Sequence, residues 1–167
     1  MSFPEAHYHP FLFTMLILAG GAEAGLTRFL INAGNARNTW PSPRYHTLLI
    51  WMLFNAIWTV LFAGAYMLWF VDRAKHLLAN IASSIFWLTV TVTLWGVSAG
   101  IFHNTRTGGR CPTSAPISRC RQSLTVEALA WVEFGLSVFA LFWTCVWVGS
   151  SGQKRVRESV RDSRRMV

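Results

Sequence analysis

The sequence predicts an all-α membrane protein in which four transmembrane helices form one bundle. Its 167 residues are 53% hydrophobic and only 13% charged, with nine Trp and twelve Phe, which is not the composition of an ordinary soluble domain. Residues 48–71 and 77–102 each run past twenty positions without a charged side chain, enough for a helix to cross a hydrocarbon core of about 30 Å. A soluble protein with very long buried helices is disfavoured, because two successive charge-free spans exceed ordinary helix lengths.

The first and last predicted spans, 11–33 and 124–148, are of similar length but contain charged residues. These are Glu23, Arg28, Glu127 and Glu133. The connections are short, and the longest, between the third and fourth spans, has the Gly-Gly, proline and hydroxyl residues typical of an irregular loop. We therefore expect one compact domain over residues 1–150. The first ten residues contain no Lys or Arg, so we expect no cleaved signal peptide and a mature chain that begins near Met1.

Residues 151–167 form a predicted basic tail. It contains two acidic residues and six basic ones, which are Lys154, Arg155, Arg157, Arg161, Arg164 and Arg165. Such a density of positive charge favours the cytosolic side, where anionic lipids attract Lys and Arg. We therefore expect both termini in the cytosol. The tail is either a short amphipathic helix on the inner leaflet or a disordered segment that only fixes topology.

Two cysteines, Cys111 and Cys120, lie in the third connection, which this topology places outside the cytosol. Disulfides persist in that oxidising compartment, so we expect these two residues to be bonded to each other, with a pair of free thiols as the alternative. A zinc site would need about four Cys or His ligands, and only His103 is near.

The spans contain no evident place for a redox cofactor. Haem needs axial ligands such as His inside the bundle, but the five His lie before the first span or at helix ends. No Cys-x-x-Cys pair is present to form a thiol redox centre. We expect no cofactor, no metal, no enzymatic activity and no nucleic-acid partner. The expected partners are the lipid bilayer, anionic lipids at the tail, and further copies of the chain or other membrane proteins.

Glycines recur at four-residue spacing on two of the spans. The pairs are Gly21 with Gly25, and Gly96 with Gly100. Small residues at this spacing let transmembrane helices approach closely, where lipid provides no hydrophobic drive for association. The pairs predict close helix packing, either within the bundle or between protomers.

The four charged residues of the spans differ in their predicted depth. Glu23 and Glu133 fall near the membrane midplane, whereas Arg28 and Glu127 fall nearer one edge. An ion pair between Arg28 and Glu127 would offset the cost of placing charge in the membrane. Glu23 has no evident partner. It belongs either to a proton, ion or substrate site with Glu133, or to a neutral hydrogen bond between helices.

Three weak motifs together resemble the fungal MARVEL-domain proteins. They are "AEAGLTRFLI" in the first span, "FWLTVTVTLW" in the third, and "GGRCPTSAPISRCRQSLTVEALAWVEF" leading into the fourth. The resemblance implies a four-span protein without catalysis that organises membrane domains, membrane apposition or vesicle traffic. It also implies cytosolic termini, a Cys pair in the second outer loop, and residence in the plasma membrane or a secretory-pathway membrane.

Two other functions remain open at the level of sequence. The chain could be an accessory subunit of a larger membrane complex, docking through its Trp-rich faces and glycine pairs. It could also be a small transporter or channel that uses Glu23 and Glu133.

Non-reducing peptide mapping tests the predicted disulfide. In protein alkylated before lysis, Cys111 and Cys120 should be recovered in one linked fragment. Recovery of both as alkylated free thiols would contradict the bond and weaken the resemblance described above.

Overall fold

The chain folds into four helices and no strand over the residues that the computed structural model describes, which are 10–37, 40–72, 81–105 and 119–163. The helices are α1 (Pro10–Arg37), α2 (Pro43–Asp72), α3 (Ile81–Thr105) and α4 (Arg119–Ser163). Each contains a stretch long and apolar enough to cross a membrane. The all-α, four-span fold class predicted from the sequence is confirmed, and the chain is an integral membrane protein.

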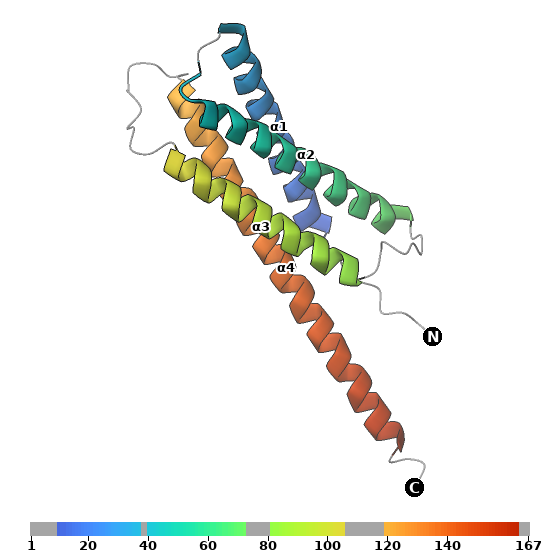
Figure 1. The fold of residues 1–167 in the computed structure, drawn as a ribbon. Coiled ribbons are helices and arrows are strands. Elements are labelled where there is room, and N and C mark those ends of the chain that lie inside the picture. Colours follow the sequence, from blue (N-terminus) through green and yellow to red (C-terminus); the bar gives the residue numbers. More distant parts are fainter. Residues whose placement is uncertain (1–9, 38–39, 73–80, 106–118, 164–167) are drawn as a thin grey trace.

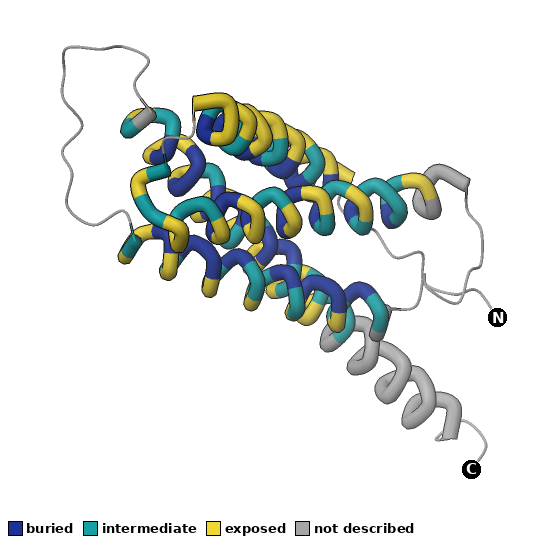
Figure 2. Tube along the Cα trace, turned by 45° about the horizontal axis from the view of Figure 1, so that its top comes forward, coloured by how far each residue is buried: buried dark blue, intermediate teal, exposed yellow. Residues whose placement is uncertain are grey.

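The helices alternate in direction along the chain and form a ring in the order α1, α2, α3, α4 (Figure 1). Each helix packs against the next one in sequence, and α4 closes the ring against α1. Antiparallel neighbours of this kind need only short connections. The ring gives every helix a buried inward face and an exposed outward face, as Figure 2 shows.

Two helices extend beyond the apolar segments that predicted them. The first continues to Arg37 rather than ending near residue 33, and the second begins at Pro43 rather than residue 48. Ser42 caps this second helix, because its side-chain oxygen accepts a hydrogen bond of 3.1 Å from the backbone N–H of Tyr45. Proline at the first helical position suits such a start. Hydropathy marks only the part of a helix within the lipid, so these ends lie outside the predicted spans.

The last helix, α4, also runs past its membrane span. It is 45 residues long, whereas its candidate span is Cys120–Val148. The basic residues Lys154, Arg155, Arg157 and Arg161 therefore lie on a continuation of the helix, which extends beyond the other three in Figure 1. Arg164 and Arg165 lie outside the described residues. The predicted boundary near residue 150 is thus not a break in the helix.

The core of the bundle consists of two apolar clusters joined by buried polar residues. One cluster lies toward the end with the α1–α2 connection and includes Leu30, Met52 and Trp95. The other lies toward the opposite end and includes Leu16 and Trp87. Where they meet, all four helices contribute fully buried or nearly fully buried polar side chains, here called the polar layer: Glu23, Thr27, Asn55, Thr59, Thr91, Ser98, Glu133 and Ser137.

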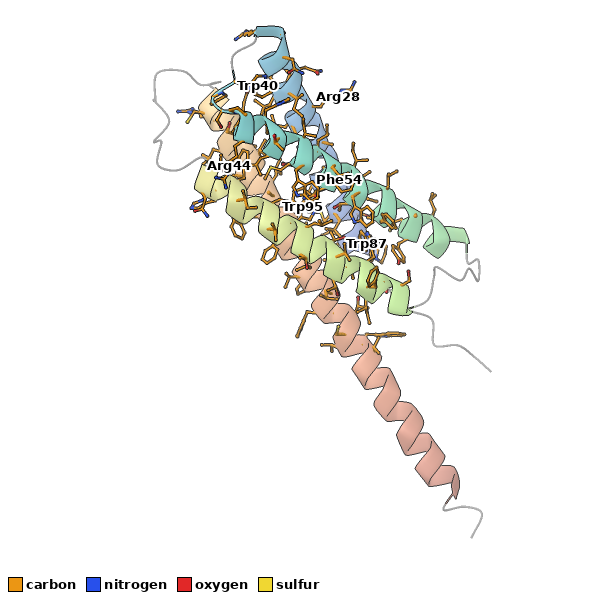
Figure 3. All side chains as sticks on the ribbon, viewed as in Figure 1. Arg28, Trp40, Arg44, Phe54, Trp87 and Trp95 are labelled. Atoms are coloured by element: carbon orange, nitrogen blue, oxygen red, sulfur yellow. The ribbon has the colours of Figure 1, made fainter. Side chains whose placement is uncertain are left out.

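Hydrogen bonds connect α2 and α3 within the polar layer. The Asn55 side-chain amide donates to the Ser98 hydroxyl at 2.7 Å. The Trp95 indole N–H donates to Thr59 Oγ1 at 3.0 Å, and that hydroxyl donates to the backbone oxygen of Asn55 at 2.9 Å. Trp95 extends between these two helices in Figure 3. Such bonds each contribute roughly 0.6 kcal/mol in membrane proteins, so they fix helix rotation more than they add stability.

Adjacent glycines on α1 provide a matched test of this packing. A Cβ on Gly20 would lie 3.1 Å from Val60 Cγ2 and 3.2 Å from Glu133 Oε1, whereas a Cβ on Gly21 would meet nothing within 4 Å. We expect Gly20→Ala to destabilise the fold by about 1 kcal/mol or more through overpacking. Gly21→Ala should leave stability unchanged, or raise it by up to about 1 kcal/mol because Ala favours helices.

The measurement is thermal unfolding of both variants in detergent, followed by tryptophan fluorescence. Equal midpoints for the two variants would contradict the inward orientation of Gly20.

Candidate functional site

Helix α1 has two chemically different faces. With 3.6 residues per turn, Gly21, Gly25 and Arg28 each lie about 140–160° around the helix from Glu23. The structure buries Gly20, Glu23 and Thr27, and exposes Gly21, Gly25 and Arg28. The inward face meets α2 and α4 and includes a carboxyl group, while the outward face combines two glycines with a cation.

The inward face brings Glu23 of α1 close to Glu133 of α4. Both side chains are fully buried, and the two carboxyl groups are near enough to interact electrostatically. Glu133 Oε1 lies 3.2 Å from the position that a Cβ on Gly20 would take, about one turn before Glu23 on α1. We call Glu23 and Glu133, with Thr27 and Ser137 one turn further along these antiparallel helices and therefore on opposite sides of the pair, the carboxyl centre.

No hydrogen-bond partner reaches the carboxyl centre from the described residues. The two carboxyl oxygens of Glu133 and the hydroxyl of Ser137 are buried without a hydrogen-bond partner among the described residues, while the hydroxyl of Thr27 interacts with the carboxyl group of Glu23 within the centre. Other helical hydroxyls in this protein donate to the carbonyl four residues earlier, namely those of Thr14, Thr47, Thr59, Thr89, Thr93, Ser98, Thr105, Thr125 and Thr144. Thr27 and Ser137 do not make this bond to the preceding turn, and neither does Thr91, whose hydroxyl accepts from the Trp58 indole N–H at 3.3 Å.

This chemistry defines what the centre can bind. Two ionised carboxylates buried without a counter-charge would cost many kcal/mol, so the favourable state of the centre is one in which this negative charge is neutralised. The described cationic side chain nearest in sequence, Arg28, is on the opposite face of α1. All donors here are oxygen, which suits protons and hard cations rather than zinc. Among the described residues no group of three or more His, Cys, Asp or Glu could form a larger metal site.

The predicted ion pair between Arg28 and Glu127 is wrong. Arg28 is exposed and points away from the other helices (Figure 3). Glu127 instead pairs with His103 at the end of α3, where Nδ1 lies 2.6 Å from Glu127 Oε1. The prediction matched two residues by depth and ignored rotation around α1. Because consecutive helices are usually neighbours, His103 was the nearer candidate.

The glycine pairs pack differently from one another. A Cβ on Gly96 would lie 3.0 Å from the Phe134 ring, so this residue does bring α3 close to α4. Beside Gly21, Gly25 and Gly100 there is open space within 4 Å. The tight contact of α1 is made by Gly20 instead, which the four-residue pattern did not identify.

The cysteines are described only in part. Cys120 takes part in a disulfide, and Cys145 on α4 is a free, exposed thiol. Cys111 lies outside the described residues, so the bond between Cys111 and Cys120 stays a prediction.

No protein-family model, curated protein or solved structure matches this chain. The class of protein that fold and site define is therefore a four-span integral membrane protein with a buried carboxyl centre, and its function has to be argued from its own geometry.

Double-mutant cycles test the observed pairing against the one it replaces. His103→Ala combined with Glu127→Gln should show a coupling of about 0.5–1 kcal/mol in unfolding free energy, because the two side chains meet. Arg28→Gln combined with Glu127→Gln should be additive. Coupling in the second cycle and additivity in the first would reverse the assignment.

Proposed function

We propose that this chain is a non-enzymatic membrane protein that organises the membrane by lateral association through the outward face of α1. The observation that carries the proposal is the exposure of Gly21 and Gly25, one turn apart, where an added Cβ would meet nothing within 4 Å. Glycine lowers helix stability by about 0.5–1 kcal/mol relative to alanine. On a lipid-facing surface, no contact within the protomer compensates for this loss of helix stability.

A notch of two glycines allows another helix to approach the α1 backbone closely. In lipid, helices associate through such close packing rather than through hydrophobic burial. We take the partner to be α1 of a second copy, which presents the same notch. Large side chains flank it on the outward surface, including Leu18 and Phe29, which are 62% and 55% exposed. These would pack around the crossing point.

Arg28 is compatible with this association. It lies nine residues before the end of α1 at Arg37, or about 13 Å along the axis. Its long side chain can snorkel toward the headgroups, which reduces the cost of a charge at this depth. Two helices that cross at the glycines diverge on either side, so the two Arg28 side chains separate and each can reach a lipid phosphate.

The proposal includes the topology and family expected from the sequence. We place both termini in the cytosol and the protein in the plasma membrane or a secretory-pathway membrane, with the basic end of α4 near anionic lipids. The MARVEL resemblance supports this role, since that family organises membranes without catalysis.

Energy transfer between labelled copies in liposomes measures the association. Gly21→Ile/Gly25→Ile should weaken it at least about tenfold, because β-branched side chains fill the notch. Gly135→Ile is the matched control, since Gly135 is exposed on α4 and a Cβ added there would meet nothing within 4 Å. The control should associate like the unmodified protein.

Undiminished transfer in the double variant, or equal loss in the control, would contradict association through α1. All three proteins should first show the same thermal unfolding, so that a change in transfer reports association.

A further inference from the structure

We propose that the outward face of α1 binds the headgroup of an anionic phospholipid through Arg28, Asn32 and Asn35. The lipid phosphate lies against the helix, and the acyl chains lie in the surrounding bilayer. This site follows the glycine notch along the same face of α1, but it does not depend on association between copies.

The three polar side chains continue the line of the two notch glycines. Positions 21, 25, 28, 32 and 35 are spaced by four, three, four and three residues, so at 3.6 residues per turn they fall within about 80° of one another. All five are exposed. We call them the outward stripe. Toward the C-terminal end of α1, the stripe changes from two glycines to a cation and two amides.

Arg28 lies at the level of the apolar part of the bundle. Leu30, two positions further on, belongs to the apolar cluster nearer the α1–α2 connection. On the other helices, residues directly beside members of this cluster expose large apolar side chains, namely Ile50, Ile101 and Trp131. A guanidinium at this level is costly unless a polar group or an anion reaches it.

No described side chain compensates the charge of Arg28. Neither Arg28 nor the amides of Asn32 and Asn35 have a hydrogen-bond or ion-pair partner among the described residues. The acidic residue of α1, Glu23, is buried on the opposite face. The compensating charge therefore comes from outside the described chain, and the anion that a bilayer provides at its edge is a lipid phosphate.

The donors of the outward stripe converge. Side chains tilt toward the N-terminus of their helix, so the amides of Asn32 and Asn35 lean back toward Arg28, which lies one turn before Asn32. Arginine presents a planar fork of N–H donors that fits a phosphate bidentately, and each amide adds two N–H donors. Together they can donate to several oxygens of one phosphate, which a single arginine on an apolar helix could not.

Charge balance favours an anionic headgroup over a zwitterionic one. Arg37 follows the stripe at the end of the helix, and no acidic side chain of α1 is exposed. Phosphatidylglycerol carries a phosphate and no cation, so it neutralises Arg28 in a low-dielectric setting. Phosphatidylcholine would instead bring its ammonium group near Arg37.

Native mass spectrometry of the delipidated full chain in detergent tests the proposal. The protein is titrated with phosphatidylglycerol and, separately, with phosphatidylcholine of the same acyl chains, and the lipids bound per chain are counted. We expect one tightly bound phosphatidylglycerol. Its apparent affinity should exceed that of phosphatidylcholine at least about tenfold, because only the anionic lipid leaves the site neutral.

Variants locate the lipid on α1. Arg28→Gln should remove the preference for phosphatidylglycerol. Asn32→Ala combined with Asn35→Ala should weaken binding at least about threefold with the arginine still present. Arg44→Gln is the matched control, since it removes an equal charge from an exposed position at the start of α2, outside the stripe. It should bind like the unmodified protein, and all variants should first show unchanged thermal unfolding.

Gly21→Ile separates this site from the lateral association proposed above. Gly21 lies two turns before Arg28, so this variant should keep the preference for phosphatidylglycerol even though it weakens association. Loss of the preference in Gly21→Ile would mean that only the associated form binds the lipid, which would overturn an independent site.

Equal affinity for the two lipids, or an undiminished preference in Arg28→Gln, would also overturn the proposal. So would an equal loss in Arg44→Gln, because binding would then follow the overall charge at this end of the bundle. Unchanged binding after loss of both amides would reduce the site to a single charge and would contradict it too.

Discussion

The buried polar layer is the constraint on which the rest of this structure depends. Lipid tails are as apolar as leucine, so hydrophobicity alone cannot tell a transmembrane helix which face to turn inward. Polar groups determine which face turns inward, because exposing a carboxyl or an amide to lipid is costly. In this chain each helix brings such groups to the level where the two apolar clusters meet, and each helix is thereby rotated to bury them.

The rotation of α1 links the interior to the lipid-facing surface. Turning Glu23 toward Glu133 brings Gly20 against α2 and α4. It also turns Gly21, Gly25 and Arg28 outward, since they lie on the opposite side of the helix. A change that released Glu23 from the interior would therefore also reorient the glycine notch. The carboxyl centre and the glycine notch use different faces of α1, but one rotation positions both.

The sequence predicted the class of fold but not the details of its site. Long apolar runs identified four helices. Counting residues inward from one edge of the membrane predicted that Glu23 and Glu133 lie at the same depth. Hydropathy missed the helix ends at Arg37 and Pro43, although Ser42 followed by proline is a recognisable helix start.

The sequence interpretation did not predict correctly how each helix is rotated about its own axis. An inward Glu23 already implies an outward Arg28 by helical geometry, which is incompatible with an Arg28–Glu127 pair inside the bundle. The contact between His103 and Glu127 depends on how far α4 extends past the end of α3, and no pattern in the sequence states that offset. The unpaired hydroxyl of Ser137 likewise depends on side-chain conformation.

The central claim, that the polar layer turns Glu23 inward and the glycines outward, is tested most directly by a nitroxide scan of α1. Single spin labels at positions 20 to 28, in protein with Cys145 replaced and reconstituted in lipid, report accessibility to dissolved oxygen. The structure predicts maxima at Gly21, Gly25 and Arg28 and minima at Gly20, Glu23 and Thr27. The opposite phase, with Glu23 and Thr27 the more accessible positions, would contradict it.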